Sequence, residues 1–182
     1  LGQATKRSGE LSSCDKDYYG TIELGIKTDT HDASGTVIGQ GDWRGISEEM
    51  IRKAFHKFTG VLEQTPPMVS ALKHQGVRLY RLARAGKTVE RPKRTVTVYE
   101  FQIEEIHLPK IRFFARVSKG TYLRTLVNDL GEMLGCFAVL SQLRRVRSGS
   151  FSLEDAITIG ELKKLDSEKL CQLIREPIST VA

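Results

Sequence analysis

One junction between a strand and a helix, at residues 118–131, constrains the fold of this chain more than any other stretch. Residues 111–117 read Ile-Arg-Phe-Phe-Ala-Arg-Val, which is typical of a strand. Apolar residues then recur at helical spacing, namely Leu126, Leu130, Met133 and Leu134. Gly120 suits the tight junction, and Gly135 suits the position just after a helix. The sequence therefore predicts a strand, a tight junction and a helix with one face on the core.

An arginine at the start of this predicted helix needs an anionic partner. Tyr122 and Arg124 lie two residues apart at the junction. The N-terminal end of a helix dipole favours anions, so a cation there is unfavourable on its own. A guanidinium binds a carboxylate or a phosphate bidentately. We therefore expect Arg124 to face one of these two groups.

The distribution of charge favours a polyanionic partner. The 182 residues carry a net charge of +6, and the sequence pI is about 9.3. Between Ser70 and Tyr99, Glu90 is the one acid, and the basic residues are Lys73, Arg78, Arg81, Arg84, Lys87, Arg91, Lys93 and Arg94. Such a local field suits RNA. A solvated basic face explains the same charges equally well.

Other compositional features favour a reduced, cytoplasmic setting. The three cysteines, Cys14, Cys136 and Cys171, are far apart and lack the spacing of metal ligands. The sequence has no apolar stretch of the length that a membrane span needs. The cluster of Asp29, His31 and Asp32 could be interpreted as a metal site, but turn-forming side chains at residues 28–35 favour a turn. We expect no metal and no organic cofactor.

The pattern of strands and helices predicts an α+β fold with a mostly antiparallel mixed sheet and flanking helices. Predicted strands lie at residues 18–25, 69–73, 95–106, 111–117 and 137–143. Predicted helices follow Ser47 and lie at residues 79–83, 157–165 and 168–174. Pro109 separates two neighbouring strands, which we expect to pair antiparallel.

Several motifs resemble those of the bacterial TruB family of tRNA pseudouridine-55 synthases. They are Lys119-Gly-Thr-Tyr-Leu-Arg124, Asp129-Leu-Gly-Glu-Met-Leu-Gly135, Leu143-Arg-Arg145 and Gln64-Thr-Pro-Pro-Met-Val-Ser-Ala-Leu-Lys73. Val69 departs from the aromatic residue that is usual in the last of these motifs. With residues 1–6 and 18–35, the motifs follow the family's order over nearly the whole chain. The resemblance implies a pseudouridine synthase-like fold.

The resemblance also implies roles for individual residues. Tyr18 matches the tyrosine that stacks on the target base, and Arg124 the arginine that pairs with the catalytic aspartate. Tyr122 and Leu143 match residues that line the same pocket. Composition alone favours core positions for the two tyrosines. The residues expected to bind RNA are Lys73, Arg78, Arg81, Arg84, Lys119, Arg144 and Arg145.

The family's nucleophilic aspartate lies in a Gly-Xaa-Leu-Asp-Pro motif, and these 182 residues contain no Leu-Asp-Pro. Asp29 and Asp32 belong to the predicted turn. Asp129 lies five residues after Arg124, a spacing that does not bring side chains together on a helix. We therefore expect the nucleophile to lie just upstream of Leu1. Arg124 would then face an empty or solvent-filled acid site, and the isolated chain would be inactive.

These features lead to one predicted function and two alternatives. We expect residues 1–151 to form the body of a catalytic domain, and residues 152–182 a helical extension toward a PUA-like domain that this chain lacks. The expected reaction is isomerisation of uridine 55 in the T-loop of tRNA. The expected partners are the T-arm and the protein's own N-terminal segment, with a monomeric chain and no membrane. The alternatives are a non-catalytic RNA-binding module and a structural domain without an RNA role.

Overall fold

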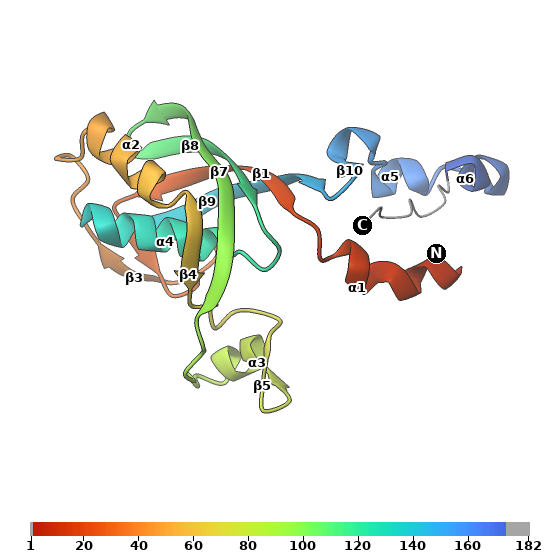
Figure 1. The fold of residues 1–182 in the computed structure, drawn as a ribbon, viewed down its shortest axis with the longest axis horizontal. Coiled ribbons are helices and arrows are strands. Elements are labelled where there is room, and N and C mark those ends of the chain that lie inside the picture. The colour runs from red at the N-terminus through yellow and green to blue at the C-terminus, as the bar shows by residue number, and fades with distance from the viewer. Residues whose placement is uncertain (1, 174–182) are drawn as a thin grey trace.

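The computed structural model describes residues 2–173 and is organised around one antiparallel sheet (Figure 1). Its six strands follow the order β10-β9-β1-β8-β7-β4, and all neighbours pair antiparallel. The strands are β1 (Lys16–Leu24), β4 (Gly60–Gln64), β7 (Arg94–His107), β8 (Lys110–Val117), β9 (Ala138–Ser148) and β10 (Phe151–Ser152). The predicted α+β class is confirmed, as is the antiparallel pairing of the strands on either side of Pro109.

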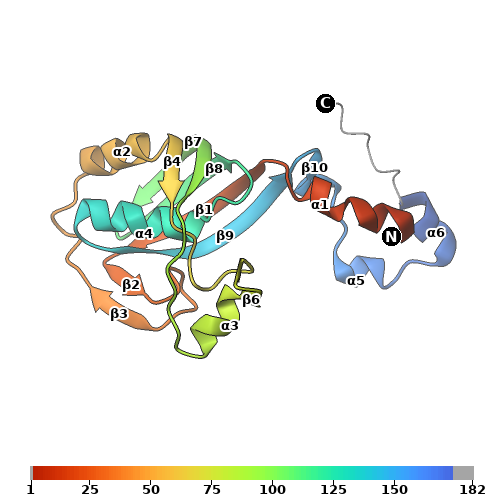
Figure 2. The same cartoon turned by 60° about the horizontal axis from the view of Figure 1, so that its bottom comes forward.

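Helices α2 (Glu48–Lys57) and α4 (Leu123–Leu134) pack on one face of this sheet, as Figures 1 and 2 show. A hairpin of β2 (Ile26–Thr28) and β3 (Val37–Gln40) lies beside them. Helix α3 (Leu79–Arg84) and the hairpin of β5 (Lys73–His74) and β6 (Val77–Arg78) project from the body. Beyond β10 lie η1 (Gly2–Arg7), α1 (Ser8–Leu11), η2 (Leu153–Asp155), α5 (Ile159–Leu162) and α6 (Ser167–Leu173).

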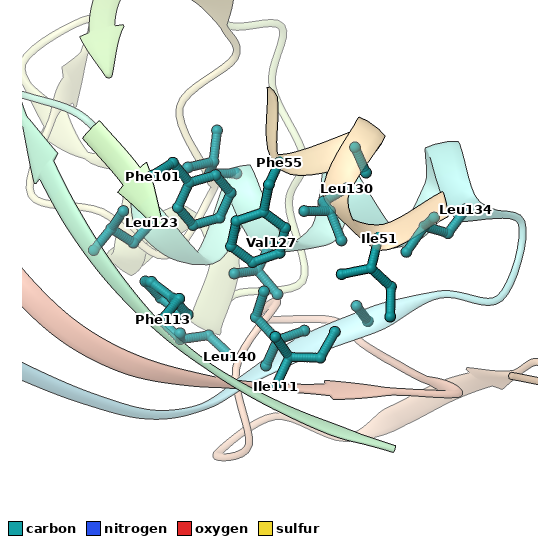
Figure 3. Close-up of a cluster of buried hydrophobic side chains, with 14 of the residues drawn as sticks. Ile51, Phe55, Phe101, Ile111, Phe113, Leu123, Val127, Leu130, Leu134 and Leu140 are labelled. Atoms are coloured by element: carbon teal, nitrogen blue, oxygen red, sulfur yellow. The ribbon is translucent and has the colours of Figure 1, made fainter. Parts of the chain in front are cut away.

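The hydrophobic core lies between the sheet and helices α2 and α4 (Figure 3). Phe101 connects the layers, because it stacks on Phe55 of α2 at 4.0 Å between ring centroids and meets Phe113 of β8 edge-on at 5.3 Å. Burying such aromatic pairs contributes both apolar area and favourable ring geometry. The apolar face of α4 is as predicted at Leu126, Leu130 and Leu134. Met133 was wrongly included, because its side chain is 39% exposed.

The predicted junction is confirmed at both ends of α4. Gly120 has a φ of 79° in the loop before the helix, and Gly135 has a φ of 74° just after it. Such left-handed conformations are accessible to glycine at little cost. Ser47 caps α2 as predicted, since its hydroxyl accepts a hydrogen bond from the Met50 amide at 3.3 Å.

Several predicted boundaries were wrong. The strand predicted at residues 137–143 continues to Ser148, because β1 pairs with β9 along its whole length. The strand at residues 69–73 shrinks to the short β5, whereas the edge strand β4 was not predicted. Short helices at the N-terminal end were missed as well. Of the helix predicted at residues 168–174, position 174 lies outside the described residues.

Candidate active site

One cavity of about 630 Å³ gathers the four residues that the sequence assigned to a reaction pocket. Tyr18 comes from β1, Tyr122 and Arg124 from the start of α4, and Leu143 from β9. Asp32, from the turn between β2 and β3, also lines this cavity. The fold therefore brings side chains from distant parts of the sequence to one place, which we call the reaction pocket.

A β-bulge places Leu143 on the pocket face of β9. Ile22 pairs with Leu140 but Thr21 pairs with Gln142, so Ser141 is an extra residue in the strand. Its hydroxyl donates to the Thr21 carbonyl at 3.0 Å. With strict alternation, Leu143 would lie on the face opposite Leu140. The extra residue brings both leucines to the same face, and Leu143 remains 47% exposed at the pocket wall.

Arg124 contacts three groups, two of which, Asp32 and Tyr122, belong to the wall of the reaction pocket. Its Nη1 donates to Asp32 Oδ2 at 3.1 Å, and its Nη2 donates to the carbonyl oxygen of Val69. The guanidinium carbon lies 6.0 Å from the centroid of the Tyr122 ring. An anionic partner for Arg124 was expected. The sequence did not indicate that this partner would be Asp32, or that the Val69 carbonyl would also accept a hydrogen bond from Arg124. The hypothesis that Arg124 faces an empty or solvent-filled acid site is wrong, because its guanidinium is paired with Asp32.

Asp32 is fixed by hydrogen bonds within its own turn. Its Oδ1 accepts from the Thr30 hydroxyl at 2.8 Å, the Ser34 amide at 3.1 Å and the Ser34 hydroxyl at 2.5 Å. Burial alone would raise the pKa of this carboxyl, but the hydrogen bonds from Ser34, Thr30 and Arg124 hold the pKa below its usual value. The predicted turn is thus confirmed. The Asp32 carboxylate also contacts Arg124, which the turn-forming residues in the sequence do not indicate.

His31 supports this turn from an unusual backbone conformation. Its φ is 64°, and its carbonyl accepts from the Leu140 amide of β9 at 3.2 Å. Burial and then the charges of Arg124, Lys27 and Arg91 lower the pKa of the ring, which is neutral at pH 7. Within residues 2–173, no three His, Cys, Asp or Glu side chains gather in a way that could hold a metal ion.

A second cavity, of about 970 Å³, adjoins the reaction pocket. It shares Tyr122 and Arg124 with that pocket and reaches Arg84, the last residue of α3, and Lys87 just after the helix. The Arg84 guanidinium lies 5.5 Å from the centroid of the Tyr80 ring. The fold therefore places basic side chains of the projecting segment beside the reaction pocket.

The remaining predicted RNA contacts are exposed but not all on one face. Lys73 and Arg78 lie directly opposite each other in the β5–β6 hairpin, an arrangement that is unfavourable for like charges unless an anion lies nearby. Arg145 pairs with Tyr18, whereas Arg144 lines cavities on the opposite face of the sheet. Lys119 is exposed in the loop before α4. The side chains of Arg144 and Arg145, which were predicted to act as a pair, therefore lie on opposite faces of the sheet.

A buried ion-pair network lies on that opposite face. Asp17 is 5% exposed and accepts from Arg147 Nε at 2.6 Å and from Arg116 Nε at 3.2 Å. Burial would raise the pKa of the Asp17 carboxyl, but hydrogen bonds from Arg147 and Arg116 lower it. No local pattern in the sequence predicts this network, because its members lie on three different strands.

No described helix is both long and apolar enough to cross a membrane.

Known proteins match this chain over nearly its whole length. Residues 1–123 match the family model described as TruB family pseudouridylate synthase (N terminal domain). Residues 124–181 match the model described as tRNA pseudouridylate synthase B C-terminal domain. The chain is 46% identical over 165 residues to tRNA pseudouridine synthase B of Geobacter sulfurreducens, covering 91% of this chain and 54% of the relative. For the protein of the same name from Alkaliphilus oremlandii, identity is 47% over 167 residues, with 92% and 56% covered.

Solved structures show the same fold. A chain in the crystal structure of a Cbf5-Nop10-Gar1 complex superposes with a TM-score of 0.66 at 30% identity, covering 89% of this chain and 39% of that one. A chain of an H/ACA RNP bound to a substrate RNA containing 2'-deoxyuridine gives 0.61 at 25% identity, with 89% and 37% covered. The present chain spans about half the length of the curated relatives it matches.

Proposed function

Because this chain belongs to the TruB family of pseudouridylate synthases, we propose that it forms the pocket in which uridine 55 of the tRNA T-loop is isomerised to pseudouridine. One observation carries the proposal: Tyr18, Tyr122, Arg124 and Leu143 line a single cavity. The relatives named tRNA pseudouridine synthase B support the same activity for the complete protein.

The reaction breaks the bond between C1′ and N1, turns the base and forms a bond between C1′ and C5. The proton at C5 leaves, and N1 gains one, so the product is an isomer of the substrate. The base must first leave its stack, which costs a few kcal/mol. In the proposed pocket Tyr18 offers a ring on which the extruded base stacks. Tyr122 and Leu143 contribute apolar wall, and Arg124 orients the carboxylate that reacts.

We propose that this reacting carboxylate does not come from the aspartates of this chain. Both oxygens of Asp32 are engaged, Oδ1 by Thr30 and Ser34 and Oδ2 by Arg124. Asp129 lines a different cavity, and burial raises its pKa. The Asp29 side chain accepts from the Thr36 amide at 2.8 Å. A nucleophile needs an ionised oxygen that is free to approach the sugar carbon.

The basic segment beside the pocket is proposed to hold the phosphates of the T-arm. Its members are Lys73, Arg78, Arg81 and Arg84. Lys119, in the loop before α4, and Arg145, opposite Tyr18 in the sheet, are proposed to add to them. Arg144, on the opposite face, stays a prediction with weaker support. The division into a body of residues 1–151 and an extension of residues 152–182 also stays a prediction, as do the monomeric state and the cytoplasmic location.

Release of tritium from 5-tritiated uridine in a T-arm hairpin tests the proposal, because isomerisation must expel that label. We expect no release from the 182-residue chain alone, and release when the family's Gly-Xaa-Leu-Asp-Pro segment is supplied by the complete protein. Release from the chain alone that disappears in Asp32→Asn would assign the nucleophile to Asp32 instead. A complete protein that binds the hairpin but releases no label would be an RNA-binding module.

Arg124→Ala in the complete protein tests the role of the guanidinium. We expect the turnover of bound hairpin to fall by about 100-fold or more, as when a preorganised charged donor is removed, with hairpin affinity largely kept. Arg112→Ala is the matched control, because Arg112 lies on the opposite face and pairs with Glu105. If affinity collapsed in Arg124→Ala while turnover of the bound complex survived, the assignment would be wrong.

A further inference from the structure

We propose that Gln64 is a positioning residue for the reaction pocket, acting through the backbone of Tyr122. The inference deepens the proposed function and rests on it. Gln64 ends β4 and lies 58 residues before Tyr122 in the chain, yet its side chain binds that residue's backbone twice. It does not line the reaction pocket.

The two hydrogen bonds imitate the pairing of a neighbouring strand. Gln64 Oε1 accepts from the Tyr122 amide at 2.8 Å, and Gln64 Nε2 donates to the Tyr122 carbonyl at 3.1 Å. Gln64 is 4% exposed, so both bonds are shielded from water. A buried amide that satisfies both its donor and its acceptor in this way specifies one geometry, because any other leaves a polar group unpaired.

Tyr122 is the residue at which the start of α4 is defined. It is the N-cap of the helix, and its own side chain forms no capping hydrogen bond. Its carbonyl also accepts the first helical hydrogen bond, from the Leu126 amide at 3.0 Å. Gln64 therefore holds the peptide from which the helix begins. A shift of that peptide would move the Tyr122 ring and, two residues on, the Arg124 side chain.

The segment that follows Gln64 returns to the same helix end. The carbonyl of Val69 accepts from Arg124 Nη2. Between these two contacts lie Pro66 and Pro67, both buried, whose rings fix φ and stiffen the segment. Residues 64–69 thus form a strap that is attached to the start of α4 at both ends. The strap leads directly into the basic segment around α3, so it connects the proposed RNA-binding side chains to Arg124.

A merely structural glutamine would affect stability but not the balance of kinetic constants. Gln64→Met in the complete protein keeps the length of the side chain and removes both hydrogen bonds. We expect kcat to fall by about 100-fold, the size of effect that a misplacement of about 1 Å causes, and KM to change by less than about threefold. A lower melting temperature with kcat unchanged would overturn the inference.

Gln64→Glu provides a conditional rescue. A protonated carboxyl presents a carbonyl acceptor and a hydroxyl donor where the amide presented its oxygen and nitrogen, whereas an ionised one cannot donate to the Tyr122 carbonyl. Burial raises the pKa of such a carboxyl. We therefore expect kcat of Gln64→Glu, as a ratio to wild type at each pH, to recover as pH falls, and the ratio for Gln64→Met to stay low.

The ratio isolates position 64, because the surrounding charged and titratable groups are the same in all three proteins. These are Glu63, Asp29, His31, Arg91, Lys93, Arg94, Arg124 and Asp129. A Gln64→Glu ratio that stays as low as that of Gln64→Met as pH falls, in a variant that remains folded, would also overturn the inference. The outcomes separate from those for the proposed function: an inactive wild-type protein contradicts the function, whereas an active one with an equally active Gln64→Met contradicts only the role of Gln64.

Discussion

The Arg124–Asp32 ion pair stands next to a histidine that stays neutral, and this juxtaposition has a consequence for stability. The lowered pKa of His31 means that the folded protein resists protonation that the unfolded chain accepts below about pH 6.5. His31 therefore has no effect on stability above about pH 6.5. Below that pH its lowered pKa makes stability fall, until the pH reaches the pKa of His31 in the folded protein. The lowered pKa of Asp32 acts in a separate range: its contribution is present above 3.8 and disappears below it.

His31→Asn should remove the first of these two effects. Asparagine tolerates the left-handed backbone at this position but does not titrate. We expect the melting temperature of wild type to fall more than that of His31→Asn between about pH 7.5 and 5.5, the range in which histidines titrate. His56→Asn, on the exposed side of α2, is the control and should keep the wild-type dependence. Equal slopes for wild type and His31→Asn would contradict the assignment.

For individual residues, the sequence identified several that line the reaction pocket. It did not predict the contacts that hold them in place. Tyr18, Tyr122, Arg124 and Leu143 were named from the family resemblance, and they meet in one cavity. Asp32 was assigned to a turn alone, because nothing in local spacing predicts a contact with a residue 92 positions away. Gln64 was identified as the start of a motif, but its contact with Tyr122 was not predicted, since its partner is a backbone group that any residue would offer.

Among the elements, α4 was predicted best, because its apolar period and flanking glycines are local signals. The contact that fixes it on the sheet is not local. Gly131 faces the start of β9, where a Cβ would lie 2.2 Å from the Ala138 amide nitrogen and 2.5 Å from the Phe137 carbonyl carbon. Helix and strand approach so closely there that a side chain of any kind would have to displace backbone.

Gly131→Ala should accordingly destabilise the protein by at least the roughly 1–3 kcal/mol that is typical of overpacking. Glycine-to-alanine changes usually stabilise helices, so the sign of this effect is diagnostic. Gly160→Ala in α5 is the control: its Cβ would meet nothing closer than 3.9 Å, and we expect no loss of stability. Urea unfolding of both variants measures the difference. A Gly131→Ala variant as stable as wild type would contradict the packing described for α4.

For the whole molecule, composition and periodicity were enough to predict an antiparallel α+β fold. They could not predict the order of the strands, or that the basic residues around α3 would project beside the reaction pocket, because both depend on long-range pairing. They also could not place Arg147 on the same face as Arg144. That placement depends on the bulge at Val146, which alternation in the sequence does not mark.

The projecting segment should dominate the salt dependence of RNA binding. Replacing Arg78, Arg81 and Arg84 together by glutamine removes charge from exposed positions while keeping polar side chains. We expect hairpin affinity to weaken and the slope of log K against log salt to decrease by about 1 for each phosphate that is no longer neutralised. The same change at Lys110 and Arg112, on the opposite face, should leave the slope unaltered. An unchanged slope in the first variant would contradict phosphate binding by α3.

The two bulges of β9 bear on how related sequences are compared. Ser141 and Val146 are both unpaired in a strand whose other residues face β1 in register. A relative that lacks one residue at either place can keep Leu143 opposite Gly20 and Arg147 opposite Asp17, since the deletion only regularises the ladder. A gap at either of these two points in an alignment with a related sequence would therefore reflect a difference in strand length. Such a gap would be compatible with an intact pocket in that relative.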